Sequence, residues 1–168
     1  MISTHIKLVS VDGFYNEEEA SRLCSIAKSL QFVEKDLGYE IENFNMVPEN
    51  ADQLFSTMFN TELMVIDDRS GVFRIPKNFI HFEGFDTPNE WLFVCALEKS
   101  FLTIYEHLDS GAKHALDKYQ LAYRDMLQWD YQAQHQLSPG QGVLFRPWLF
   151  HSMDHGLVQL FRLREHAG

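Results

Sequence analysis

The chain has 168 residues, of which 45% are hydrophobic, and it carries a formal net charge of −10 at pH 7. This length suits one domain with one core, and 14 phenylalanines supply bulky apolar surface to fill it, so global disorder is excluded. The acidic balance, with no run of basic residues, argues against nucleic-acid binding, because phosphate contacts need clustered Lys and Arg.

The sequence also lacks the marks of export or of a membrane span. Residues 1–10 contain no apolar stretch long enough for a signal peptide, and no apolar run approaches the length that crosses a bilayer. The two cysteines, Cys24 and Cys95, lie in apolar contexts and form no CxxC motif, so we expect buried free thiols. We therefore expect a soluble, cytoplasmic protein, or part of an assembly built inside a cell.

The first 60 residues predict a short strand followed by two helices. Residues 6–11 are expected to form the strand, and Asn16 is placed to cap the first helix, with Glu19 at the N3 position of a capping box. Apolar residues then recur at helical spacing, at Ala20, Leu23, Cys24, Ala27 and Leu30. A second, shorter helix is expected to begin at Asn50 and to place Leu54, Phe55 and Met58 on one side.

From about residue 63 the pattern changes to β-rich segments. We expect strands at 63–66, 72–82 (interrupted at Pro76), 91–97, 101–107, 129–137, 142–145 and 157–163. A helical insertion is expected near 112–127, where apolar residues again recur at helical spacing. Because the strands come as a block rather than alternating with helices, the pattern predicts an α+β fold.

A strand block of this length suits a double-stranded β-helix, which is the jelly-roll or cupin-like type of barrel. We expect a single domain over residues 1–168. Residues 1–60 would supply the N-terminal strand and the helices, packed on one sheet, and residues 61–168 would form the barrel core.

Two histidines and one carboxylate are candidates for a metal site. Successive strand side chains point to opposite faces, so His81 and Glu83 share a face and can chelate one ion. His151 follows a Pro-Gly turn and a short strand, and in a jelly roll such a position can fold back beside the second strand. Two His and one carboxylate on one face of an octahedral ion form the facial triad of non-haem Fe(II) oxygenases.

A late arginine is the candidate for binding a carboxylate beside that metal. Arg162 lies on the strand that follows His151, and a buried guanidinium there would pair bidentately with a carboxylate. Arg164 shares its strand face and is the second candidate.

A rival ligand pair exists at His107-Leu108-Asp109, which is a literal His-x-Asp motif. We place it second, because it would leave too little chain before His151 for the intervening strands. Using His81 leaves room for the segments 91–97, 101–107 and 132–137 between the ligands.

These motifs together resemble the 2-oxoglutarate/Fe(II)-dependent dioxygenases, in particular the prolyl-hydroxylase-like branch. The segments 9–14 and 16–20 are similar to the opening strand and helix of that branch, and His81-Phe82-Glu83 is similar to its His-x-Asp/Glu pair. The segment 139–145 is similar to the turn and strand before the distal histidine, with His151 as that ligand. The resemblance runs from about residue 8 to 164, and the order and spacing of these motifs carry it.

The resemblance implies an enzyme that uses Fe(II) and 2-oxoglutarate. His81, Glu83 and His151 would be the metal ligands and catalytic centre, and Arg162 would bind the far carboxylate of 2-oxoglutarate. The substrate would be a peptide side chain or a small molecule. Glu83 departs from the family, which mostly has Asp at this position; the extra methylene would shift the metal or loosen its binding.

Two other interpretations use the same barrel. In the first, it is a non-catalytic structural or interaction module with assembly partners or as a homo-oligomer, for example a neck or tail component of a phage virion. In the second, it is a cupin that binds another divalent metal or a sugar. A late buried arginine pointing at the metal would count against the cupin.

Overall fold

The computed structural model describes residues 8–30, 32–35, 38–41, 47–66, 70–75, 79–81, 89–107, 129–146, 150–154 and 156–166. Its helices are α1 (Glu17–Lys28) and α2 (Ala51–Phe59). Its strands are β1 (Leu8–Val11), β2 (Phe32–Lys35), β3 (Gly38–Ile41), β4 (Leu63–Val65), β5 (Gly71–Ile75), β6 (Phe79–His81), β7 (Glu90–Ala96), β8 (Ser100–His107), β9 (Trp129–Leu137), β10 (Gly142–Phe145), β11 (Phe150–Asp154) and β12 (Gly156–Glu165).

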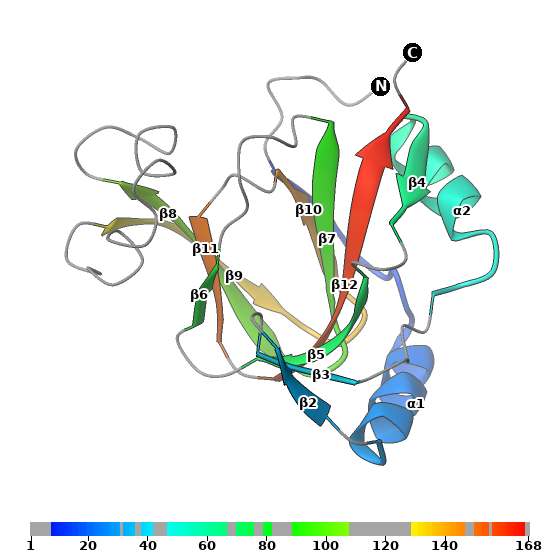
Figure 1. Cartoon of the computed structure of the whole chain (residues 1–168), viewed down its shortest axis with the longest axis horizontal. Helices are drawn as coiled ribbons and strands as arrows, with labels where there is room; N and C mark the ends of the chain where they lie inside the picture. Colours follow the sequence, from blue (N-terminus) through cyan, green and yellow to red (C-terminus); the bar gives the residue numbers. More distant parts are fainter. Residues whose placement is uncertain are drawn as a thin grey trace.

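The described strands form two sheets that face each other (Figure 1). The larger sheet has the order β1-β10-β7-β12-β5-β3-β2, with β4 paired to β12, and the smaller sheet has the order β6-β11-β8-β9. Neighbouring strands in both sheets run antiparallel. The expected α+β double-stranded β-helix is therefore confirmed.

The predicted strand at 72–82 divides between the two sheets. Its first part, β5, pairs with β12 in the larger sheet, and its last part, β6, pairs with β11 in the smaller sheet. Pro76, where the sequence predicted an interruption, lies between the two parts, in a segment outside the described residues. The change of sheet brings His81 onto the wall of the barrel opposite the larger sheet.

An inner core fills the space between the sheets. Side chains from both sheets contribute to this core. Where a strand contributes more than one, they are spaced two residues apart, because such residues share a face. Its members are Phe73, Leu92, Val94, Ala96, Leu102, Ile104, Leu137, Val143, Phe145, Met153, Val158 and Leu160.

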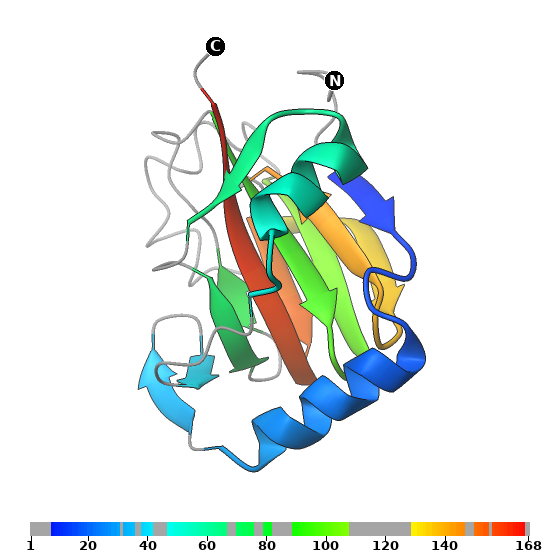
Figure 2. The same cartoon turned by 90° about the vertical axis from the view of Figure 1, so that its right-hand side faces the viewer.

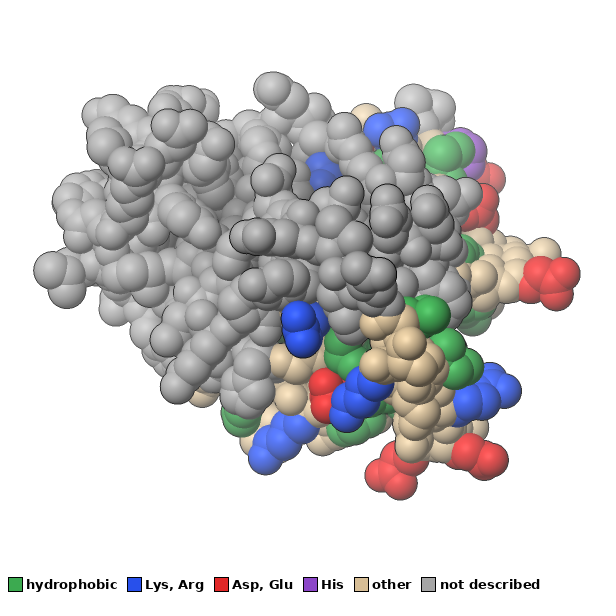
Figure 3. All heavy atoms as spheres, turned by 60° about the horizontal axis from the view of Figure 1, so that its bottom comes forward, with side chains coloured by type: hydrophobic (Ala, Val, Ile, Leu, Met, Phe, Trp, Pro, Cys, Tyr) green, Lys and Arg blue, Asp and Glu red, His purple; other side chains and the backbone are tan. Residues whose placement is uncertain are grey.

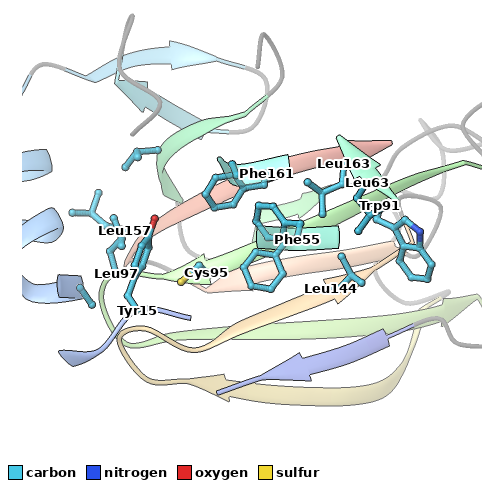
Figure 4. Packing of buried hydrophobic residues seen from close by; sticks show 14 of the residues in the cluster. Tyr15, Phe55, Leu63, Trp91, Cys95, Leu97, Leu144, Leu157, Phe161 and Leu163 are labelled. Atoms are coloured by element: carbon cyan, nitrogen blue, oxygen red, sulfur yellow. The ribbon is translucent and has the colours of Figure 1, made fainter. Parts of the chain in front are cut away.

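An outer core lies between the larger sheet and the two helices, which cross the outer face of that sheet (Figure 2). Phe55 of α2 stacks on Phe14 at 5.4 Å between ring centroids and meets Phe93 and Phe161 edge-on. Figure 4 shows Phe55 among side chains of the sheet, with Tyr15 at one end of the row and Trp91 at the other. The prediction that the N-terminal helices pack on one sheet is thus confirmed.

Helix α1 forms as its local signals predict. The side chain of Asn16 accepts a hydrogen bond of 2.8 Å from the backbone N–H of Glu19, whose side chain accepts one of 3.2 Å from the N–H of Asn16, completing the capping box. The buried face carries Ala20, Cys24 and Ala27. Leu30 was expected on this face, but it lies beyond the helix end at Lys28 and is 37% exposed.

Helix α2 begins where the sequence predicted but differs in two details. Asn50 precedes the helix in a left-handed conformation and makes no side-chain capping bond. Leu54 was expected on the same side as Phe55 and Met58, but it is 41% exposed, while Ala51, Phe55 and Phe59 are buried. The buried stripe follows spacings of four residues, which turns Leu54, one residue before Phe55, toward solvent.

In two other parts of the chain, the structure confirms no prediction. The hairpin of β2 and β3 was not predicted; each strand has only four residues, too few for alternation to stand out. The helical insertion expected near 112–127 lies outside the described residues.

The described surface mixes charge types. On the face shown in Figure 3, acidic, basic and apolar side chains are interspersed. An ion pair of 2.9 Å between Lys28 and Glu98 links the end of α1 to the turn after β7. In the described part of the chain, neither α1 nor α2 is long and apolar enough to cross a membrane.

Candidate metal and co-substrate site

The two predicted histidine ligands are brought together by the pairing of β11. This strand lies between β6 and β8, and His151 stands directly opposite His81 on one side and Ile104 on the other. In an antiparallel ladder, directly opposite residues share a face and have Cβ atoms about 5 Å apart. The backbone therefore places the two positions as neighbours on one face of the smaller sheet, although 70 residues separate them in the chain.

The His151 side chain lies inside the barrel. It is 3% exposed, and Met153, two residues along the strand and thus on the same face, belongs to the inner core. Its ring meets the ring of Phe145 edge-on, with centroids 4.8 Å apart. An imidazole in this position is held by packing and shielded from water.

The remaining parts of the predicted ligand set lie outside the described side chains. Glu83 falls in an undescribed segment, and of His81 the structure describes the backbone. Among the side chains that are described, no group of three or more His, Cys, Asp or Glu is arranged to hold a metal ion. The assignment of His81, Glu83 and His151 as ligands stays a prediction, and the donor types suit Fe(II).

The rival histidine lies away from this point. His107 pairs with Trp129 at the end of β8, three residues beyond Ile104, which is the residue opposite His151. Three residues of strand correspond to about 10 Å. The register thus favours His81 over His107 as the partner of His151, and Asp109 lies outside the described residues.

Arg162 is buried on the inner face of β12. It is 4% exposed, and it shares its face with the inner-core residue Leu160. Its guanidinium donates to Glu90 Oε2 from Nε at 2.7 Å and from Nη2 at 2.6 Å. Its backbone N–H donates to the hydroxyl of Ser70 at 3.0 Å. These contacts fix both the backbone and the charged head of Arg162.

Arg164, the second candidate, lies nearer the surface. Its side chain is 51% exposed, and its Nη2 donates to Glu90 Oε1 at 3.0 Å. Glu90 therefore bridges the two arginines, with one carboxylate oxygen toward each. Burial tends to raise the pKa of Glu90, but the hydrogen bonds from Arg164 and Arg162 outweigh it, so the pKa lies below the ordinary value.

Sequence reasoning missed Glu90. The residue stands at the start of the buried strand β7, directly opposite Arg164 and diagonal to Arg162. The visible signal was a lone glutamate before an apolar run, and its significance depends on the register between β7 and β12. That register is a property of the folded sheet and is not written in either segment alone.

A row of directly opposite residues across the larger sheet connects the surroundings of His151 with Arg162. Leu92 stands opposite Phe145 on one side and opposite Arg162 on the other, and Phe145 contacts His151. Two strand spacings, roughly 10 Å, separate the backbones of Phe145 and Arg162. His151 and Arg162 thus lie at one level of the barrel interior, on facing sheets.

Comparison with known proteins supports the fold. No protein-family model and no curated protein matches the chain. Solved structures do match. HygX from Streptomyces hygroscopicus, with nickel and 2-oxoglutarate bound, aligns over 96% of this chain and 84% of its own, with a TM-score of 0.59 and 11% identity.

Two further structures give the same result. The non-haem α-ketoglutarate-dependent epimerase SnoN from nogalamycin biosynthesis has a TM-score of 0.61 and 12% identity over 95% of this chain and 78% of its own. An oxidoreductase of the 2OG-Fe(II) oxygenase family from Burkholderia pseudomallei has a TM-score of 0.54 and 12% identity over 98% and 87%. The chain therefore has the double-stranded β-helix fold of the 2-oxoglutarate/Fe(II) oxygenases, and at this level the resemblance drawn from its motifs is confirmed.

Proposed function

We propose that the chain is an Fe(II)/2-oxoglutarate-dependent oxygenase that hydroxylates a small molecule or a peptide side chain. The observation that carries the proposal is the direct pairing of His151 with His81, at the same level of the barrel as the buried Arg162. Among the neighbours, the HygX structure has nickel and 2-oxoglutarate bound, and SnoN is an α-ketoglutarate-dependent epimerase, which supports the choice of cofactors.

The residues have distinct roles in this proposal. His81, Glu83 and His151 would hold the iron, Arg162 would pair with the far carboxylate of 2-oxoglutarate, and the half-exposed Arg164 would add positive charge beside it. When bound, iron and 2-oxoglutarate supply the oxidising chemistry: one O₂ converts 2-oxoglutarate to succinate and CO₂ and places one oxygen atom in a C–H bond of the substrate.

The chain itself contributes orientation and exclusion of water. Phe145 packs against the His151 ring and limits its rotation, while Ser70 and Glu90 hold the strand and head of Arg162. The inner core closes the space around them with apolar side chains. A dry interior strengthens every charge interaction made there. The two buried free thiols are typical of a reducing compartment and support a cytoplasmic location.

The test is anaerobic metal and co-substrate binding, followed by succinate detection. Wild-type protein loaded with Fe(II) should develop a visible charge-transfer band with 2-oxoglutarate and should release succinate on exposure to oxygen. His151→Ala should lose both signals, whereas His166→Ala, which alters an exposed histidine, should keep them. A wild-type protein that binds Fe(II) and 2-oxoglutarate no better than His151→Ala would refute the proposal.

A second candidate is a non-catalytic barrel that serves as a structural or interaction module. One observation favours it: Arg162 already has a carboxylate partner within the chain, as a barrel without co-substrate would need. The oxygenase neighbours give no support to its narrower form, a phage virion component. The binding experiment separates the two candidates.

A further inference from the structure

We propose that Glu90 determines which 2-oxo acids this site accepts, by competing with the far carboxylate of the co-substrate for Arg162. The inference rests on the proposed function and adds to it a residue that lowers the preference for 2-oxoglutarate over 2-oxo acids that end in an apolar group. The group responsible is part of the chain and is present before any co-substrate binds.

The contact geometry is the first support. Glu90 Oε2 accepts from both Nε and Nη2 of Arg162, at 2.7 and 2.6 Å, so a single carboxylate oxygen occupies the Nε–Nη2 edge of the guanidinium. Both side chains are buried, Glu90 at 4% and Arg162 at 4% exposure. A carboxylate thus already engages one edge of the guanidinium that the proposed function assigns to the co-substrate.

The charge balance is the second support. Arg162, Arg164 and Glu90 together carry a net charge of about +1. One of the two positive charges, that of Arg164, lies in a half-exposed position. A second carboxylate on Arg162 would be placed close to that of Glu90, and like charges repel strongly in a buried site. A 2-oxo acid with a methyl group at the same end avoids this repulsion.

The third support is that Glu90 is fixed and charged. It stands at the first residue of β7, in register with Arg164, and its two oxygens are held by different strand positions of β12. The same arginines keep its pKa below the ordinary value, so the carboxylate stays ionised at neutral pH. Competition with a ligand therefore persists throughout the physiological pH range.

The experiment compares two matched acids on full-length protein loaded with Mn(II), which permits binding without turnover. Calorimetry gives the Kd for 2-oxoglutarate and for 2-oxopentanoate, whose terminal methyl replaces the far carboxylate. Their ratio is measured for wild type, Glu90→Gln and Glu90→Asp. Glu98→Gln is the matched control, because Glu98 lies in the turn after β7 and pairs with the exposed Lys28.

Glu90→Gln is expected to raise the preference for 2-oxoglutarate about tenfold, the scale of one charge-assisted hydrogen bond. Glu90→Asp keeps a charge beside the buried arginines and shortens the reach by one methylene, so it should fold and shift the preference in the same direction by less. Glu98→Gln should leave the ratio unchanged.

Each remaining outcome counts against the proposal. A ratio that stays constant, or that falls in both Glu90 variants, shows that Glu90 does not compete and leaves the oxygenase function standing. Failure of every form, wild type included, to bind either acid in the presence of Mn(II) overturns this inference and the proposed function together.

Discussion

The turn before β10 offers a sharp test of how close packing fixes this part of the barrel. Gly140 has a φ of 93°, and a Cβ built on it would overlap the backbone carbonyl oxygen of Tyr15. The glycine is also tied by two hydrogen bonds: its N–H donates to Ala96 at 2.8 Å, and its carbonyl accepts from Tyr15 at 3.2 Å. In Gly140→Ala, the added methyl group would therefore clash with the Tyr15 carbonyl, and the two hydrogen bonds would keep the turn from moving away.

The magnitude follows from comparison with a second glycine. Gly13 has a φ of 66°, and nothing lies within 4 Å of a Cβ added there. Gly13→Ala should cost only the left-handed conformation, about 1 to 2 kcal/mol. Gly140→Ala pays a similar conformational cost and the steric overlap, which a rigid carbonyl cannot relieve by rotating a side chain, so we expect about 4 kcal/mol in all.

Urea unfolding followed by tryptophan fluorescence measures both variants, because the fully buried Trp91 reports on loss of the core. The difference in unfolding free energy between the two variants reports the contact with Tyr15 together with the larger φ of Gly140. If Gly140→Ala were no less stable than Gly13→Ala, the reasoning that Tyr15 closes against this turn would be wrong.

Three further outcomes are expected. Phe55→Ala should lower the free energy of unfolding by about 4 kcal/mol, since the ring is fully buried, whereas Leu54→Ala on the exposed side should change it by under about 1 kcal/mol; a urea titration checks both. The folded pKa of Glu90 is lowered, so its contribution to stability is present above the unfolded pKa of about 4.3 and is lost as pH falls through the folded pKa; Glu90→Gln should flatten that acid limb in urea titrations run at successive pH values. Burial raises the pKa of Cys95 to about 12 and also raises that of Cys24, so a thiol reagent at pH 8 should label neither in native protein and both in urea.

The starts of both helices were predicted correctly, because the signals for a helix start lie in a few adjacent residues. The Asn16 and Glu19 pair specifies the start of α1 without help from the rest of the fold. At α2 the start was also predicted correctly, and Asn50 stands at the cap position in a left-handed conformation without a side-chain capping bond. The error at Leu54 came from choosing a face without knowing where the sheet would lie.

The features of the site that involve distant parts of the chain were predicted only in part. The positions of His81 and His151 within the barrel order followed from the resemblance of motifs, and their direct pairing required the register of β6 with β11. Glu90 was missed because its partners lie on another strand, more than 70 residues away. A buried ion pair across two strands leaves no periodic trace in either.

The site depends on one register more than on any other. A slip of one residue in β11 would turn His151 from the interior to the outside, because side chains alternate between faces. The three residues of β6 cannot specify that register alone, but β11 also pairs with β8 over five residues, from Phe150 opposite Tyr105 to Asp154 opposite Phe101. The β8 pairing, with Met153 packed in the inner core, therefore holds the histidine inward, while β6 is positioned by it. Disruption of β8 should expose His151 even where the predicted ligands themselves are unchanged.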